Sequence, residues 1–318
     1  MKAMVEGVWR TDVVPTPAYR AAAERARFRD WVSADAGSGF EAAPGRYHLY
    51  VSYACPFAHR TLLGRALLVG LDEAIAISVL DPDWSGPTGW VFGARPAATP
   101  DHANGLASLP EVYRKANPRF TGKVTVPVLW DKARATIVNN ESAEILRMLE
   151  LEFCAFAKKE VDLYPEALRT DIDRINDFVG PRINGGVYRA GFASTQESYD
   201  AAVIDLFAAL DALEEHMEMR DFLVGGRLTE ADLRLFPTMV RFDVAYYGAL
   251  RCNLKRLADY PRLLAHMRRI YALPGVAATL KLDHVKRHYW DDHPMINRRI
   301  VPIGPPAGWD RTAVAHAA

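Results

Sequence analysis

The order of elements between residues 47 and 80 constrains the fold of this chain more than any other feature. Residues 47–53 are rich in aromatic and β-branched side chains, which predicts a strand. Pro56 suits the first position of a helix, because an N–H there would have no partner, and apolar positions at helical spacing follow until Gly70. Residues 74–80 then have the composition of a second buried strand. The sequence therefore predicts a β-α-β unit with a parallel strand pair.

This order places Cys55 at or just before the N-terminus of the predicted helix. Unpaired N–H groups and the helix dipole favour an anion there, and such a position lowers a thiol pKa from about 8.5 to between about 3.5 and 7.5. Position 58 is Ala58 and not a second cysteine, so any disulfide of Cys55 must form with a small thiol or a substrate. The alternative, a small buried apolar side chain, fits this context less well.

Composition narrows the class of protein. Lys plus Arg and Asp plus Glu each number 39 in 318 residues, so no overall field favours nucleic acid or an anionic membrane as a partner. Three cysteines do not make a disulfide framework and indicate a reducing compartment. No signal peptide and no run of about 18 apolar residues is evident. We expect a cytoplasmic protein with no nucleic-acid or membrane partner.

Two segments of the first half invite a functional interpretation. Residues 81–109 form a long loop rich in Gly and Pro with two tryptophans, and loops of this length are usually functional or disordered. Residues 124–130 predict a strand interrupted by Pro127, which belongs at an edge or a bulge. A cis Val126–Pro127 bond would turn the Val126 backbone outward to pair with an extended ligand. A trans proline on an edge strand is the alternative.

The remaining pattern predicts two domains. A short strand at 136–138 and a helix opening at 139–142 complete the element order of a thioredoxin-like domain, whereas after residue 160 the pattern is helical only. In that part Thr229 and Asp232 predict a capping box. The predicted helices comprise 21–31 near the N-terminus and, in the second half, 171–178, 196–219, 229–246 and 260–271. We predict an N-terminal extension (1–45), a thioredoxin-like domain (46–158) and an all-helical domain (165–318) with a coil tail from Asn297.

Several stretches together resemble the glutathione transferase superfamily, and most closely its Xi class, the glutathionyl-hydroquinone reductases. The resemblance runs from about Trp31 to Pro305. The stretches that carry it are 55–60 (CPFAHR), 89–92 (GWVF), 124–132 (VTVPVLWDK), 139–145 (NNESAEI), 186–193 (GVYRAGFA), 286–289 (KRHY) and 301–305 (VPIGP).

The resemblance implies a glutathione-binding thioredoxin-like domain and a helical domain that binds the acceptor. It assigns Cys55 as the nucleophile and Val126 as the residue whose backbone pairs with the cysteinyl part of glutathione. Glu141 and Ser142 would hold the γ-glutamyl end at a helix N-terminus. Trp90 would line the glutathione site from the long loop. Lys123 stands where the class usually has arginine, so it keeps the charge but loses the bidentate fork.

In the helical domain the resemblance assigns Tyr188 and Tyr289 to contact with the quinol ring, and Trp290 stands where relatives often have tyrosine. Glutathione would act as co-substrate, with a glutathionylated aromatic as the acceptor. A homodimer is implied by the resemblance alone. We expect no metal, because His284 and His288 have a ligand spacing but lack an evident third ligand.

For the assigned residues, structural roles remain as alternatives. Glu141 and Ser142 can be a helix acid and cap, Trp90 and the two tyrosines can be packing aromatics, and Lys123 can be a solvated charge. The other two cysteines, Cys154 and Cys252, are expected to be buried and inert.

The predicted function is glutathione-dependent reduction of glutathionyl-hydroquinones through a Cys55–glutathione mixed disulfide, with release of oxidised glutathione. Two alternatives remain open. One is an Omega-like thioltransferase or dehydroascorbate reductase, and the other is a non-catalytic binding module on the same fold. A conjugating transferase is disfavoured, because it needs a Ser or Tyr hydroxyl where this chain has a cysteine.

Overall fold

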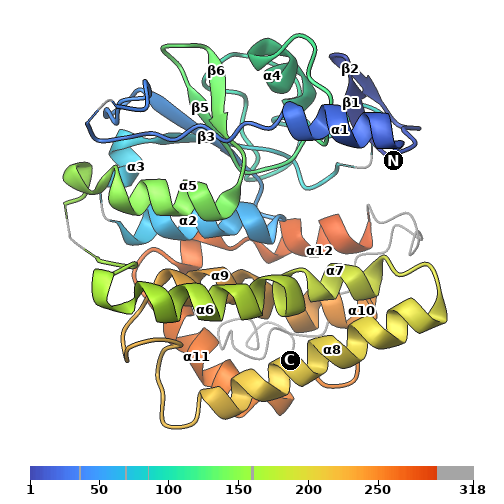
Figure 1. Ribbon diagram of the computed structural model, residues 1–318, viewed down its shortest axis with the longest axis vertical. Helices are drawn as coiled ribbons and strands as arrows, with labels where there is room; N and C mark the ends of the chain where they lie inside the picture. The colour runs from blue at the N-terminus through green and yellow to red at the C-terminus, as the bar shows by residue number, and fades with distance from the viewer. Residues whose placement is uncertain (36, 69, 85, 159–160, 292–318) are drawn as a thin grey trace. The chain divides into compact units, whose positions relative to one another are not determined.

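The computed structural model describes residues 1–35, 37–68, 70–84, 86–158 and 161–291 (Figure 1). They form two compact units, one ending at Val161 and the other beginning at Asp162. The elements of the first unit are β1 (Ala3–Val5), β2 (Val8–Arg10), α1 (Pro17–Arg25), β3 (Tyr47–Val51), α2 (Pro56–Leu67), α3 (Leu71–Ala74), β4 (Ala76–Val79), α4 (Leu109–Ala116), β5 (Val128–Asp131), β6 (Thr136–Asn139), α5 (Ser142–Leu151) and the 3₁₀ turn η1 (Cys154–Phe156).

The first unit is built on a sheet with the strand order β4-β3-β5-β6. β3 pairs parallel with β4 and antiparallel with β5, and β5 pairs antiparallel with β6. All five residues of β3 are buried, and α2 and α5 run side by side against the sheet (Figure 1). The predicted β-α-β unit is confirmed, and this arrangement is a thioredoxin-like fold. The domain boundaries at 45, 158 and 165 stay predictions.

The second predicted strand is shorter than expected. A helical turn, α3, occupies the start of the predicted range 74–80, and β4 begins only at Ala76. Gly70 has a φ of 103°, a left-handed conformation that suits glycine, and it begins this turn. The apolar run alone could not distinguish the turn from the strand that follows it.

The predicted helix at 21–31 is wrong in its bounds. The side chain of Thr16 accepts from the N–H of Tyr19, and Pro17 takes the first helical position, so α1 begins earlier than predicted and ends at Arg25. The chain that follows is extended along the edge of β6. There Arg29 bridges to Asn139, and the N–H of Asp30 donates to Val138 O over 3.0 Å.

The position of Pro127 also differs from the prediction. The Val126–Pro127 bond is cis, which settles the alternative that the sequence left open. β5 starts at Val128 and lies between β3 and β6, so it is not an edge strand. Pro127 is tolerated because it precedes the ladder, where no N–H is needed.

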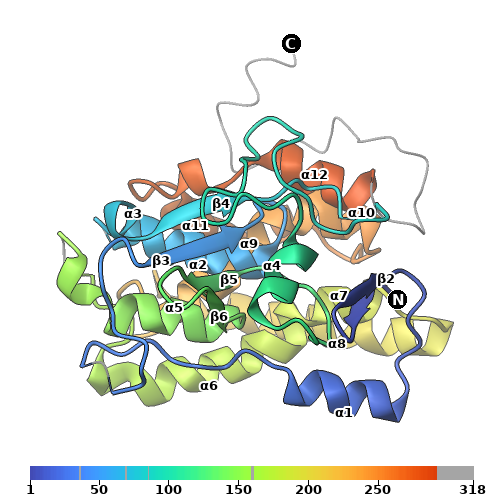
Figure 2. The same ribbon diagram turned by 90° about the horizontal axis from the view of Figure 1, so that it is seen from above.

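The described part of the second unit is helical. Its elements are η2 (Glu166–Leu168), α6 (Arg169–Val179), η3 (Gly180–Asn184), α7 (Gly186–Gly191), α8 (Gln196–His216), α9 (Glu230–Arg241), η4 (Phe242–Tyr246), α10 (Tyr247–Ala249), η5 (Leu257–Asp259), α11 (Pro261–Tyr271), η6 (Ala277–Thr279) and α12 (Leu282–Trp290). α7 packs along α8 in both views (Figure 1, Figure 2).

The predicted helix at 229–246 begins as expected but changes its geometry. The N–H of Thr229 donates to Asp232 Oδ2 over 2.8 Å, which confirms the capping box. α9 then ends at Arg241, and η4 is a π-helical turn. Periodicity at 3.6 residues per turn could not show this change, because a π turn inserts its residues without an apolar signature.

The predicted burial of the two other cysteines is half right. Cys252 is buried, and burial raises the pKa of its thiol to about 12. Cys154 is exposed, because it lies in the short turn η1 that follows α5 and not on a core-facing helix. The tail from Asn297 and the stretch 301–305 lie outside the described residues. Across the described ranges, no helix has the length and apolarity to cross a bilayer.

Candidate functional site

The candidate nucleophile occupies the position that the sequence predicts. Cys55 is the N-cap of α2, its carbonyl accepts from the N–H of His59 over 3.0 Å, and Pro56 takes the first helical position. The side chain is half-buried, and its thiol donates to Val126 O over 3.6 Å. The thiol therefore lies at the start of a helix, beside the residue that precedes the cis proline. The lowered thiol pKa stays a prediction.

Glu141 and Ser142 form the start of α5. Glu141 is its N-cap, and Oε1 accepts from the N–H of Ala143 and from the hydroxyl of Ser142, both over 3.3 Å. Ser142 is only 2% exposed, and its hydroxyl also accepts from Arg60 Nη1 over 3.2 Å. The capping role that the sequence offered as an alternative is therefore present. It does not compete with anion binding, since both use the same helix N-terminus.

Trp90 belongs to the long loop that follows β4. The loop forms bridges between Leu80 and Phe92 and between Val91 and Ser108. Trp90 is 8% exposed and stacks on Trp84, with ring centroids 6.5 Å apart. The described part of this loop is thus packed against the core, and a packing role accounts for most of the Trp90 surface.

Lys123 is exposed and lines a cavity of about 590 Å³ in the first unit. Glu141 lines the same cavity, so the fold brings together two residues that the family resemblance assigns to the glutathione site. Arg20, Arg27 and Arg29, from α1 and the segment after it, line it as well. The volume falls within the range of small-molecule sites.

Tyr113 also belongs to this region, although it is not among the site residues that the sequence predicts. Its buried hydroxyl donates to Thr125 O over 2.9 Å and accepts from Asn140 Nδ2 over 3.0 Å. It therefore ties together the two loops that carry Val126 and Glu141. The sequence does hold a signal for the helix that carries Tyr113, because Ser108 and Glu111 have the spacing of a capping box. In the structure they form that box at the start of α4.

In the second unit the two assigned tyrosines lie in direct contact. Tyr188 on α7 and Tyr289 on α12 have their hydroxyl oxygens 2.5 Å apart. Tyr188 is half-buried, whereas Tyr289 is 3% exposed, and burial raises its pKa well above the usual value. A third phenol, Tyr246, has its oxygen 3.4 Å from that of Tyr289. Tyr246 is not among the site residues that the sequence predicts, because the pattern places it only at the end of the predicted helix 229–246.

Trp290 is anchored beside this group. Its indole Nε1 donates to Val244 O over 3.1 Å, within the π turn that carries Tyr246. Among the side chains that the structure describes, no group of three or more His, Cys, Asp or Glu is arranged to hold a metal ion.

Comparison with known proteins places these features in a family. Residues 54–152 match the model of the glutathione S-transferase N-terminal domain, and residues 196–269 match that of the C-terminal domain. The chain is 46% identical over 308 residues to the glutathionyl-hydroquinone reductase PcpF of Sphingobium chlorophenolicum, with 96% of each chain covered.

Two solved structures are similar over nearly the whole chain. An Xi-class glutathione transferase from Natrialba magadii superposes with a TM-score of 0.92 at 45% identity, covering 98% of this chain and 95% of that one. The glutathione-bound structure of YqjG, a glutathione transferase homologue from Escherichia coli K-12, gives a TM-score of 0.87 at 42% identity, covering 98% and 99%. The chain is therefore an enzyme of the glutathionyl-hydroquinone reductase family, the Xi class of the glutathione transferases.

Proposed function

We propose that this enzyme uses glutathione to reduce glutathionyl-hydroquinones to hydroquinones, with Cys55 as the nucleophile. The observation that carries the proposal is a half-buried thiol at the N-cap of α2, with Ala58 where a dithiol enzyme has its second cysteine. A mixed disulfide formed at Cys55 has no neighbouring thiol in the motif to resolve it, so an external thiol must do so.

The reaction proceeds in two displacement steps. The Cys55 thiolate attacks the sulfur of the glutathionyl-hydroquinone, an S–S bond forms and the bond from sulfur to the ring carbon breaks. The ring carbon keeps the bonding electrons and takes a proton, which gives the hydroquinone. The thiolate of a second glutathione then attacks the mixed disulfide, releasing oxidised glutathione and regenerating Cys55.

Glutathione is held, in this proposal, by residues of the first unit. The Val126 backbone pairs with its cysteinyl part, and the N–H groups at the start of α5 receive the γ-glutamyl carboxylate beside Glu141 and Ser142. Lys123 contributes charge, and Trp90 contributes apolar surface. The cavity shared by Lys123 and Glu141 supports this assignment.

The tyrosines of the second unit supply a proton or a hydrogen bond to the ring. Tyr188 is the accessible phenol of the group, and Tyr289 stays protonated at neutral pH because burial raises its pKa. A protonated Tyr289 can donate to Tyr188 as Tyr188 donates onward, so the contact between their hydroxyls supports a relay.

Turnover of three substrates by the purified enzyme tests the proposal: a glutathionyl-hydroquinone, dehydroascorbate and a glutathione mixed disulfide. The highest kcat/KM is expected for the glutathionyl-hydroquinone, with parallel lines in double-reciprocal plots as a ping-pong mechanism requires. Preference for dehydroascorbate or the mixed disulfide would instead support the Omega-like alternative. No turnover of any of the three would support a binding module.

We also propose that the enzyme is a homodimer, a view that rests on its family alone. Size-exclusion chromatography with light scattering is expected to give twice the mass of one chain. A mass of one chain at micromolar concentration would refute it.

A further inference from the structure

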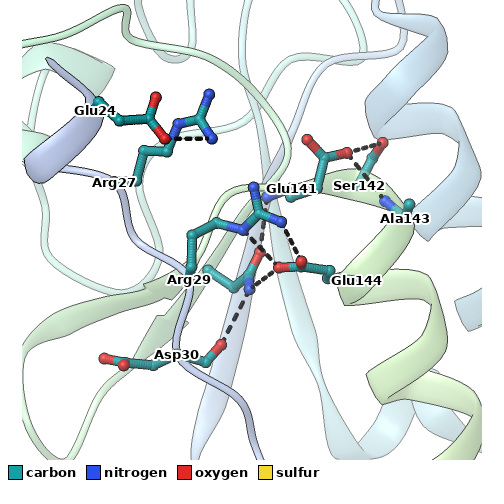
Figure 3. Close-up of polar contacts among 9 residues, drawn as sticks. Glu24, Arg27, Arg29, Asp30, Glu141, Ser142, Ala143 and Glu144 are labelled. Carbon is teal, nitrogen blue, oxygen red and sulfur yellow. Dashed lines mark hydrogen bonds and ion pairs between the residues drawn. The ribbon is translucent and has the colours of Figure 1, made fainter. Parts of the chain in front are cut away.

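The segment that follows α1 is fastened to the start of α5 by an arginine. Arg29 Nε donates to Glu144 Oε2 over 2.8 Å, and a second guanidinium nitrogen contacts Oε1, so the pair is bidentate (Figure 3). The guanidinium fork matches a carboxylate in two bonds and fixes its plane, which a lysine does not do. Arg29 thereby determines the orientation of Glu144.

The carboxylate of Glu144 is linked to the backbone of Glu141 through the side chain of Asn139. Glu144 Oε2 accepts from Asn139 Nδ2 over 2.7 Å, and Nδ2 also donates to Asp30 O over 3.0 Å. With both amide hydrogens of Asn139 used, its Oδ1 accepts from the N–H of Glu141 over 2.7 Å. The orientation of the Glu141 backbone is thus fixed through Asn139 by two partners, one of them held by Arg29.

The charge state suits this role. Burial raises the pKa of Glu144, but the hydrogen bonds from Arg29 and Asn139 outweigh it and hold the pKa below its usual range. Glu144 is therefore a carboxylate at neutral pH and accepts from both partners. The hydrogen bond to Glu144 raises the pKa of Arg29 above its ordinary value, and the nearby carboxylates of Glu141 and Glu24 add smaller contributions in the same direction.

Arg29 and Glu141 line the same cavity of about 590 Å³. We propose that Arg29 is a positioning residue for glutathione, which acts through Glu144 and Asn139 to hold Glu141 where it receives the ammonium group of the γ-glutamyl end. The N-terminal segment then forms part of the glutathione site. This inference rests on the proposed function, because it takes glutathione as the occupant of the region around Glu141.

Arg27 provides a matched control. It lines the same cavity two residues away, but it pairs with Glu24 in the last turn of α1 over 3.0 Å, and both side chains are more than half exposed. Loss of Arg27 removes the same charge from the cavity wall without touching the path to Glu141. If only the charge of the cavity wall matters, the Arg27 and Arg29 variants should weaken glutathione binding equally. If Arg29 positions Glu141, the Arg29 variant should weaken it more.

The experiment compares Arg29→Gln, Arg29→Lys and Arg27→Gln in the full-length enzyme, by steady-state kinetics and by calorimetric titration with glutathione. For Arg29→Gln we expect KM and Kd for glutathione to rise about tenfold, while kcat and KM for the aromatic substrate stay within about twofold. For Arg29→Lys, KM and Kd for glutathione are expected to lie between those of wild type and Arg29→Gln, because lysine keeps the charge but cannot form the bidentate pair. Arg27→Gln also removes a charge from the cavity wall, so KM and Kd for glutathione are expected to rise, but clearly less than in Arg29→Gln.

Glu144→Gln and the double variant complete the test. If Arg29 acts through Glu144, the double variant should bind glutathione no more weakly than the weaker single variant, since residues of one network are non-additive. Equal effects of Arg27→Gln and Arg29→Gln, or additive effects in the double variant, would overturn the inference. Wild type that binds glutathione but does not reduce glutathionyl-hydroquinones would refute the proposed function alone, because the titration still decides the role of Arg29.

Discussion

The thiol of Cys55 donates a hydrogen bond to the carbonyl oxygen of Val126 across 3.6 Å. This contact joins the N-terminus of α2 to the residue that precedes the cis proline, although the two residues lie 71 positions apart. It places the candidate nucleophile beside the backbone that we assign to the cysteinyl part of glutathione. A glutathione sulfur bound to that backbone would therefore lie close to Cys55.

Replacement of Cys55 by Ala or Ser should abolish turnover of glutathionyl-hydroquinones, by at least about three orders of magnitude, as the loss of a covalent nucleophile does. The glutathione Kd should change far less, since the backbone of Val126 and the start of α5 remain. Initial rates and calorimetric titration measure the two effects. Turnover retained by either variant would overturn the assignment of the nucleophile.

Replacement of Tyr188 by Phe should lower kcat for glutathionyl-hydroquinones by about a hundredfold, the lower end of the range for loss of a general acid. Reduction of a glutathione mixed disulfide with an aliphatic leaving thiol should stay within about twofold, because no ring carbon is protonated. Tyr289→Phe should have a smaller effect on the first reaction and none on the second. Equal losses with both substrates would indicate a general loss of fold and not a role at the ring.

Much of the first unit could be predicted because its signals are local. Each of these signals lies within a few neighbouring residues: the proline at the first helical position, the aromatic and β-branched strands, and the helix start at Glu141. The bidentate pair of Arg29 and Glu144 could not be found in this way, because it joins residues 115 positions apart in a polar stretch without periodicity. Its existence depends on the chain running extended along β6, where we predicted helix.

The phenol group of the second unit shows a similar limit. The resemblance assigned Tyr188 and Tyr289, but that their hydroxyls meet follows only from how α7 and α12 pack. Tyr246 joins them because η4 has π geometry, and sequence periodicity assumes the α-helical repeat.

Gly64 should tolerate no side chain. A Cβ at this position of α2 would lie 2.6 Å from Leu146 Cδ1 on α5, and Leu146 is fully buried. We expect Gly64→Ala to destabilise the protein by about 1–3 kcal/mol, as overpacking does. Gly186→Ala in α7 is the matched control, because its Cβ would meet ordinary contacts from 3.4 Å outward and should gain helix propensity. Thermal unfolding of both variants measures the difference, and equal midpoints would contradict the packing argument.

His48 should make stability depend on pH. It is buried on β3 with Nε2 2.8 Å from Ser78 Oγ, and burial lowers its pKa from 6.5 to about 4. Between these two pH values the unfolded chain binds a proton that the folded protein does not, so stability is full above pH 6.5 and falls as the pH drops toward 4.

The loss attributable to His48 should be on the order of 3 kcal/mol across that window. His48→Gln keeps a polar partner for Ser78 and has no proton to gain, so its unfolding free energy in urea should fall less between pH 7 and pH 5. The same decrease in wild type and variant would show that His48 is not the group responsible.

In the proposed cycle, Cys55 carries glutathione as a mixed disulfide. Intact-protein mass spectrometry after exposure to oxidised glutathione, followed by peptide mapping, tests this step, and Cys154→Ser removes the exposed thiol that could compete with Cys55. We expect a single glutathione adduct, mapped to Cys55, in wild type and in Cys154→Ser alike, and its removal by added glutathione. An adduct on Cys154 alone, with Cys55 unmodified, would contradict it.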